Sequence, residues 1–370
     1  LYDENPELVL TAGNEITSFN GDLTNVDDLS VPLLKINDLQ GDKLNQNPFF
    51  NRISGNPSEN YISLINKKDP SFIICWIGMG DFLDFAVGGA EVEDLLTPEN
   101  EFYTRFEHLI SGLLEGSELK IGIGNLISVS DLPFFYLKQY NFITLDNSAK
   151  SSAQARYSAF NSAVAAHNVG KPNEELRPFI SFEDNGATLY PQPIVVIDNN
   201  LPDAFYPDGS PLEKFRQLKN GDLALFSISD EMVANGFGSH IPLPEAYYLS
   251  ETEVQLINEQ INSYNQIINE VADKYSQRTV VVDVNSEVQK ISDSSKFDAW
   301  GIPSKDTVYY DSGVPIRADI SMNSIFSLDA VYFNQRGNAF IANVFLKSIN
   351  EKFSANIPLA TINNYVGNVY

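Results

Sequence analysis

The stretch that decides the fold is Ser71-Phe72-Ile73-Ile74-Cys75-Trp76-Ile77-Gly78, an apolar run that ends on a glycine. β-Branched and aromatic side chains are enriched in strands, and a short apolar run that stops at a glycine is typical of a strand buried on both faces. Such strands belong to parallel sheets that helices cover on both sides. The run therefore predicts a buried strand over 71–77 and an α/β fold.

The rest of the chain continues the alternation of strands and helices. A helix is expected from Thr97 and Pro98, because threonine is a good N-cap and proline suits the first helical turn. Ser250 followed by Glu253 is a capping box in front of a long amphipathic helix. Further strands are expected over 119–123, 194–197, 223–226 and 279–284, and further helices over 250–275 and 335–353.

This order of elements predicts a single domain over 1–370. Its parallel sheet lies between two layers of helices, a three-layer α/β/α arrangement. The polar segment 145–190 interrupts the alternation. Region 145–250 is therefore expected to hold an insertion.

Composition excludes several classes of protein. The 370 residues are 43% hydrophobic and 12% aromatic, which is enough for a sizeable core and excludes wholesale disorder. The formal charge of −25 argues against nucleic acid as a partner, and against an anionic membrane surface unless a lipid anchors the chain. No apolar run reaches the ~18 residues of a transmembrane helix.

The only cysteine, Cys75, lies in the apolar run, so no disulfide forms within the chain, and a buried strand cysteine is expected rather than a nucleophile. The sequence opens on Leu1 instead of a methionine. A processed form or a fragment is therefore expected, with any targeting segment or lipidated cysteine upstream.

Five blocks of the sequence, in order, match known motifs. They are 30–35 (V-P-G-A-K), 47–52 (N-P-Y-F-x-R), 76–83 (W-I-G-N-N-D-V-L), 124–135 (A-N-I-P-D-V-x-x-I-P-Y-F) and 327–337 (S-L-D-G-V-H-P-N-x-x-G). In these blocks, and in the tail around 356–365, the chain resembles the SGNH/GDSL-type hydrolases, in particular the long members found in Bacteroidota. The resemblance implies a three-layer, flavodoxin-like α/β/α fold and ester hydrolysis by a serine nucleophile, a histidine base and an oxyanion hole.

At the catalytic positions the chain departs from the family. The G-D-S or G-N-S nucleophile block is missing, so it lies upstream of the first residue or does not exist; Ser18 lacks the preceding Gly-Asp. Leu33 stands where the resemblance places the oxyanion glycine, and Gly80 where it places the oxyanion asparagine. Tyr332 replaces the catalytic histidine, although Asp329, three residues earlier, remains.

These replacements remove the chemistry. Loss of one side-chain oxyanion donor, as at Gly80, typically costs ~10²–10³ in kcat. The Leu33 side chain could fill the space of a substrate carbonyl. Tyr332 is a poor general base at neutral pH, because tyrosine has an unperturbed pKa near ~10. The resemblance therefore implies a pseudoenzyme.

No other group of residues supplies a catalytic or cofactor site. Of the three histidines, His240 is the best substitute base, because it follows a glycine-rich turn; His108 and His167 are interpreted as ordinary helix and insertion residues. Their scatter does not suit a metal site. The glycines of 122–124 lack the rest of a dinucleotide fingerprint, and the carboxylates of 81 and 84 are more typical of caps than of a metal site. No cofactor is expected.

Two functions remain open from the sequence. The first is a catalytically inactive binding or accessory subunit of an outer-membrane complex, with protein partners in the cell envelope, at the cell surface or in the periplasm. An upstream lipid anchor would make it a lipoprotein, and a glycan- or lipid-binding module is a variant of this function. The second is an active serine ester hydrolase of the lipase or esterase kind, whose nucleophile lies upstream of Leu1 and whose base is a substitute such as His240.

The missing nucleophile block also has a structural consequence. In the family this serine follows a strand inside the sheet, and an unfilled place there leaves backbone donors and acceptors unpaired. We expect the N-terminal residues to rebuild this strand, an upstream segment to supply it, or a partner chain to do so.

Overall fold

The computed structural model describes residues 27–32, 34–39, 47–54, 60–92, 95–183, 189–297, 308–311 and 313–369. In these ranges the chain has a mixed α/β fold whose main sheet has three parallel strands in the order β1-β2-β9. The prediction of an α/β fold is therefore confirmed. The flavodoxin-like arrangement that the resemblance implies stays a prediction. The three strands are β1 (Phe72–Cys75), β2 (Lys120–Gly124) and β9 (Thr279–Val282).

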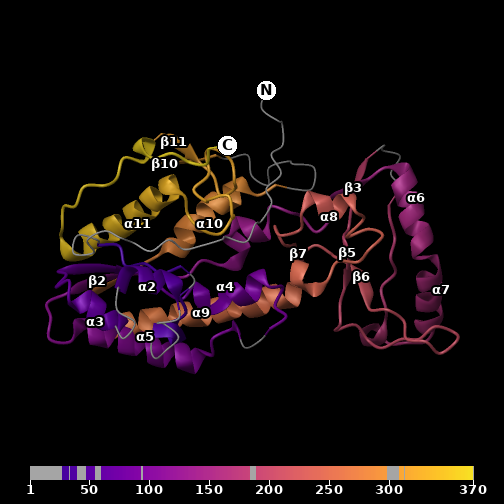
Figure 1. The fold of residues 1–370 in the computed structure, drawn as a ribbon, viewed down its shortest axis with the longest axis horizontal. Helices are drawn as coiled ribbons and strands as arrows, with labels where there is room; N and C mark the ends of the chain where they lie inside the picture. Colours follow the sequence, from indigo (N-terminus) through magenta and orange to yellow (C-terminus); the bar gives the residue numbers. More distant parts are fainter. Residues whose placement is uncertain are drawn as a thin grey trace.

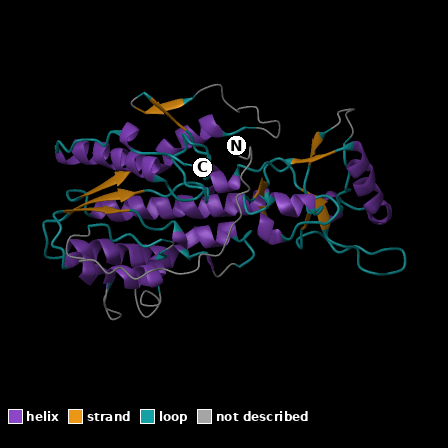
Figure 2. Cartoon of the chain, turned by 45° about the horizontal axis from the view of Figure 1, so that its top comes forward, coloured by secondary structure: helices purple, strands orange, loops and turns teal. Residues whose placement is uncertain are grey.

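Helices cover the sheet on both faces, and the strands lie as a layer between them (Figure 2). One side holds α5 and α9, with α3 packed on α5; the other holds α11, with α10 beside it (Figure 1). These helices are α3 (Tyr61–Asn66), α5 (Glu99–Leu114), α9 (Glu251–Lys274), α10 (Val284–Ser295) and α11 (Gln335–Phe353).

Glycines in β2 bring α11 close to the sheet. A Cβ atom on Gly122 would meet the Ile349 side chain at 3.5 Å, and one on Gly124 would come 2.8 Å from the Phe345 ring. Ile121 and Ile123, on the opposite face, are fully buried. The sequence Lys-Ile-Gly-Ile-Gly thus gives the strand one bulky face and one flat face.

The long helices agree with their sequence signals. Ser250 and Glu253 form the expected capping box, and α9 ends one residue before the expected boundary. The last helix has the expected bounds, with Asn334 as its N-cap. The helix after Thr97 forms as well, but it begins at Glu99 with Pro98 as N-cap, and no side chain caps it.

Two of the expected strands do not join the parallel sheet. β5 (Val195–Ile197) pairs antiparallel with β6 (Phe215–Gln217), and β7 (Leu223–Ala224) pairs antiparallel with β8 (Tyr248–Leu249). The reason lies in their packing: Val196 and Ala224 are buried in a hydrophobic cluster of this region, separate from the core that surrounds the three parallel strands.

The region expected as a polar insertion has hydrophobic cores of its own. One cluster includes Ile143, Ile194 and Leu243, and a second includes Tyr157 and Phe160. This part of the chain lies at one end of the molecule, where the N-terminus of α9 meets β8 (Figure 1). Its other elements are β3 (Ile143–Leu145), β4 (Tyr190–Gln192), α6 (Asn147–Arg156), α7 (Ser158–His167) and α8 (Asp230–Ala234).

The remaining elements are short. β10 and β11 form an antiparallel hairpin. Two further helices, α2 and α4, belong to the first half of the chain (Figure 1). Their bounds are α2 (Pro48–Ser54), α4 (Gly80–Val87), β10 (Tyr309–Asp311) and β11 (Val314–Ile316). Single 3₁₀ turns lie at Ile36–Leu39, Val129–Asp131, Pro133–Phe135, Asn173–Glu175, Glu245–Tyr247 and Ile362–Asn364.

Within the described ranges β1 is an edge strand, which differs from the fully buried strand expected there. The Ile74 side chain is 50% exposed, and its neighbours in β1 are only partly buried. The physical reason is that no described strand lies on the outer side of β1. Residues 1–26 lie outside the described ranges, so the origin of a further strand stays a prediction.

Candidate functional site

Gly80 follows β1, and the loop of Asp329 and Tyr332 reaches the same edge of the sheet, because Phe333 packs on Trp76 there. This carboxyl edge is where α/β sheets commonly bind ligands. After β1 the chain turns at Gly78, whose φ of 119° is open to glycine but rarely to other residues. α4 then begins at Gly80, which is buried and has no side chain to donate. The position to which the resemblance assigns an oxyanion asparagine therefore offers backbone groups alone. Leu33 lies outside the described residues.

Asp81 ties three segments together at the start of α4. Its carboxylate accepts the Ile36 N–H at 3.0 Å and the Thr97 hydroxyl at 2.7 Å, and it is fully buried. Burial raises its pKa to about 7, although these hydrogen bonds act in the opposite direction. The Thr97 hydroxyl is thus used by Asp81, which is why it does not cap α5.

The neighbouring carboxylate, Asp84, does not act as a cap. It forms an ion pair with Lys35 at 3.4 Å, and the Lys35 ammonium also donates to the Leu95 carbonyl at 3.1 Å. Both carboxylates therefore hold the segment after Leu33 against α4. Neither points to a metal, and no cluster of His, Cys, Asp and Glu suited to a metal ion occurs in the described part of the chain.

Asp329 is engaged in its own turn. One oxygen of its carboxylate accepts the Ser327 hydroxyl at 2.8 Å and the N–H groups of Val331 and Tyr332 at 2.8 and 2.9 Å. Ala330, inside this turn, has a φ of 62°, so the carboxylate holds a left-handed residue in place. Asp329 therefore serves the backbone of the loop that presents Tyr332, a side chain that is 41% exposed.

Aromatic rings fill the space beside this loop. The Trp76 ring lies 5.8 Å from the Phe333 ring and 6.3 Å from the Phe345 ring, measured between centroids. Its indole N–H donates to the Asn125 carbonyl at 3.0 Å. A Cβ atom on Gly124 would come 2.7 Å from Trp76, so the indole lies directly on the strand. The carboxyl edge between β1 and β2 is thus packed with apolar rings.

The histidines lie away from this loop. His240 contacts two serines: Nε2 is 3.1 Å from the Ser152 hydroxyl, and Nδ1 is 3.2 Å from the Ser239 hydroxyl. His167 contacts the Glu175 carbonyl at 3.0 Å, and His108 lies in α5. No described contact joins any of the three to Asp329. The pairing of His240 with Ser152, which is 88 residues away, has no signal in the sequence.

The thiol of Cys75 has the properties of a strand cysteine. Burial raises its pKa to about 12, so the thiolate that a nucleophile needs is disfavoured. The chain holds no second cysteine, so Cys75 has a free thiol.

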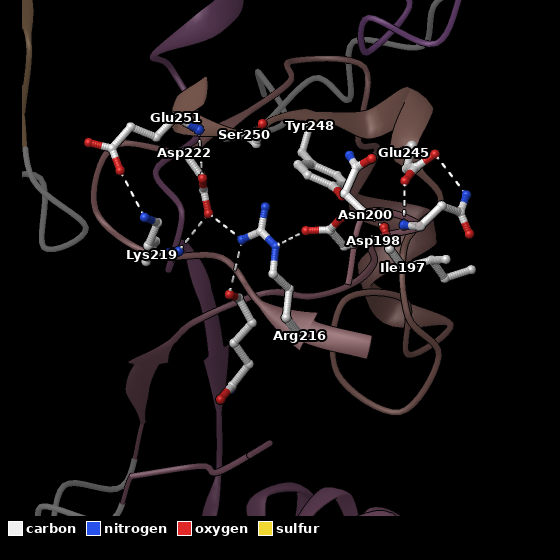
Figure 3. A network of polar contacts seen from close by, with 12 residues as sticks. Ile197, Asp198, Asn200, Arg216, Lys219, Asp222, Glu245, Tyr248, Ser250 and Glu251 are labelled. Carbon is white, nitrogen blue, oxygen red and sulfur yellow. Dashed lines mark hydrogen bonds and ion pairs between the residues drawn. The ribbon is translucent and has the colours of Figure 1, made fainter. Parts of the chain in front are cut away.

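The most extensive ionic cluster that we find in the described part of the chain was not foreseen from the sequence (Figure 3). Arg216 in β6 forms ion pairs with Asp198 at 2.6 Å and with Asp222 at 2.5 Å. Asp222 also accepts the N–H of Glu251 at 2.9 Å, at the start of α9. Through Asp222 the cluster connects β6 to the start of α9. Because the guanidinium and both carboxylates bind one another, few charged groups remain to bind a ligand.

An open cavity of about 780 Å³ lies over α6 and α7. Its polar wall is largely occupied: both ends of the Asn161 amide bond the backbone of Ile180, and the Gln154 carbonyl oxygen accepts the N–H of Phe182. Side chains already used in this way offer few groups for a ligand.

No family model, curated protein or solved structure matches this chain. None of the helices in the described ranges combines the length and the apolar character that crossing a membrane requires.

Proposed function

We propose that this chain is a catalytically inactive protein with an SGNH-hydrolase-like scaffold, which acts as a binding or accessory subunit in the cell envelope. One observation carries the proposal: the Asp329 carboxylate is used by its own turn, and Tyr332 stands where a base would have to be. A triad needs a carboxylate that orients an imidazole. Here one oxygen of the carboxylate accepts backbone N–H groups of its own turn, and no described contact joins Asp329 to a histidine.

The surroundings agree with this proposal. Gly80 provides no side-chain donor for an oxyanion, and Trp76 packs between Gly124 and Phe333 at the edge where a substrate would enter. A fold of this kind can be kept for binding once its chemistry is lost, because function lies in the site rather than in the fold.

The test is hydrolysis of short- and medium-chain p-nitrophenyl esters by the wild type and by the double variant Gly80→Asn, Tyr332→His. We expect both to stay at the uncatalysed background, because the described part of the chain holds no serine–histidine pair with an oxyanion hole. We expect fluorophosphonate probes to label no serine. Turnover well above background by the wild type contradicts the proposal.

A second candidate, a serine ester hydrolase, is favoured by the contacts of His240. The Ser239 hydroxyl donates to the Gly236 carbonyl at 3.2 Å, so its oxygen is left to accept from Nδ1 of His240. The lone pair of Nε2 then faces the hydroxyl of Ser152, as in a nucleophile–base pair.

This pair ranks second because it has no oxyanion hole. Ser152 lies inside α6, beyond the first turn, where backbone N–H groups are already used by the helix. In the same assay, hydrolysis that disappears in both Ser152→Ala and His240→Ala, but persists in Ser151→Ala, would make this candidate the right one. Ser151 is a matched control, since it is exposed on the same helix and its hydroxyl donates to the Asn147 carbonyl.

A further inference from the structure

Residues 355–369, which we call the C-terminal strap, return along α11 after that helix ends (Figure 1). Two asparagine side chains of the helix hold the backbone of the strap. Asn350 accepts the N–H of Ile357 at 2.8 Å and donates to the carbonyl of the same residue at 2.9 Å. Asn343 binds both backbone groups of Ala360 in the same way, at 2.7 and 2.9 Å. The helix thus grips the strap by its backbone.

The end of the strap is bound by the loop between β11 and α11. Asn368 is 9% exposed, and its amide group donates to the carbonyls of Ile320 and Phe326 at 2.8 and 3.0 Å. A Cβ atom on Gly367 would come 2.1 Å from the carbonyl oxygen of Met322, so the strap lies directly on this loop and a larger residue would push it off. Gly367 and Asn368 therefore form a latch.

The loop held by the latch is the loop that presents Tyr332. The N–H of Ser327, the residue after Phe326, donates to the Tyr332 carbonyl at 2.7 Å. The ring of Phe326 stacks on the ring of Phe333, with 4.7 Å between the centroids, and Phe333 packs on Trp76. A continuous set of contacts therefore runs from the latch to the carboxyl edge of the sheet.

The strap buries little apolar surface. Of its residues, all of which the structure describes, Ile362 is the only one whose apolar side chain is buried. Val366 and Val369, on either side of the latch, are 53% and 75% exposed. Segments with few buried apolar contacts open at a lower free energy than the core does. The strap, held mainly by hydrogen bonds, can therefore open while the sheet stays folded.

We propose that the C-terminal strap opens and closes as a unit, and that its latch positions the loop of Tyr332. While the strap is closed, the loop is fixed at the carboxyl edge of the sheet. When the strap opens, the loop loses the two donors of Asn368 and is free to move. This inference rests on the proposed function, because the loop belongs to the edge that a binding subunit of this fold presents, and it names the segment that controls the loop.

Hydrogen exchange at single amides of the full-length chain measures the opening. The N–H groups of Ile357 and Ala360 are expected to have similar protection, because the strap opens as a unit. The N–H of Ile121, which donates to the Arg278 carbonyl within the parallel sheet, is the reference for the core. Both strap amides are expected to exchange at least about tenfold faster than this reference.

A variant of the latch tests the positioning of the loop. Asn368→Leu keeps the volume of the side chain and removes its two donated hydrogen bonds. Exchange of the N–H groups of Val331 and Tyr332, which the Asp329 carboxylate accepts, is expected to rise at least about fivefold. Exchange at Ile121 is expected to stay as in the wild type. A merely structural role of the side chain would instead raise exchange at Ile121 as well, because the whole chain would be less stable.

A second variant and a control complete the test. Gly367→Ala places a Cβ atom against the loop, so it opens the latch by a different route and serves if Asn368→Leu fails to fold. The matched control is Asn364→Leu, which replaces an exposed asparagine of the same strap. The control is expected to leave exchange at Val331 and Tyr332 within about twofold of the wild type.

Three results would overturn the inference. If Ile357 and Ala360 are as protected as Ile121 in the wild type, the strap does not open apart from the core. Unchanged exchange at Val331 and Tyr332 in both latch variants would show that the latch does not position the loop. A rise at Ile121 as large as the rise at Tyr332 would indicate general destabilisation. Ester hydrolysis is measured separately, so failure here is distinguishable from failure of the proposed function.

Discussion

At the scale of single residues, two carboxylates in the family-like blocks do structural work. Asp81 accepts hydrogen bonds from two other segments of the chain, Asp329 accepts them within its own turn, and no described contact joins either to an imidazole. Their identities were readable from the sequence as part of the resemblance. Their partners were not, because the segments that meet at Asp81 are brought together by tertiary packing, such as that of α5 on the turn at Ile36–Leu39.

The raised pKa of Asp81 predicts a pH dependence of stability. Its folded pKa is about 7 and its usual value is 3.8, so the folded state holds the proton more tightly. The stabilising contribution is present below pH ~4 and is lost as the pH rises through ~7, by up to roughly 4 kcal/mol. Asp81→Asn removes this titration, because the amide is neutral at every pH.

Urea unfolding of wild type and Asp81→Asn at several pH values between 4 and 8 checks this. The wild type is expected to lose stability relative to the variant as the pH rises. If the free energy of unfolding changes with pH equally in the two proteins, Asp81 ionises at its ordinary pKa.

At the scale of elements, helix boundaries followed local chemistry closely. The Ser250–Glu253 capping box and the Asn334 N-cap mark the starts of α9 and α11, because side chains that satisfy the first N–H groups act within a few residues. α6 and α7 were missed, since they bury small residues and few large apolar ones. A helix with so weak an apolar face has little periodic signal.

The capping box is open to a direct test. Ser250→Ala is expected to lower the free energy of unfolding by about 1 kcal/mol, because the N–H of Glu253 loses its acceptor. Chemical denaturation measures the change. Ser162→Ala is the control, because this exposed hydroxyl lies inside α7 and caps nothing, and its effect should be within about 0.5 kcal/mol. Equal effects of the two substitutions would show that the cap contributes nothing.

At the scale of the whole molecule, the Arg216 cluster joins the region between β3 and β8 to the layered part of the fold. Both of its carboxylates are nearly buried, and one of them accepts the first N–H of α9. Removing the cation would leave two nearly buried carboxylates without their counterion. Arg216→Leu is therefore expected to destabilise the protein by about 3–5 kcal/mol.

Denaturant unfolding, with hydrogen exchange to locate the change, measures this effect. Lys219→Ala is the control: it removes an exposed ion pair with Glu251 and should cost no more than about 1 kcal/mol. If Arg216→Leu is as mild as the control, the cluster does not hold the two parts together. A loss of protection centred on 189–250 would confirm the tie.

The sequence by itself determined the alternation of strands and helices, the strands near 72, 120 and 280, and the caps of the long helices. Each of these depends on neighbouring residues: apolar periodicity, β-branched content and capping side chains act over one or two turns. The replacements at Gly80 and Tyr332 were also readable, since they are a matter of residue identity.

Only the tertiary structure decided the rest. It made β1 an edge strand, directed the Asp329 carboxylate into its own turn, placed Ser152 against His240 and assembled Arg216 with two distant aspartates. These contacts join residues that are far apart in the chain or depend on which strand has a neighbour. Local sequence patterns do not predict such contacts, because long-range contacts depend on the packing of whole elements.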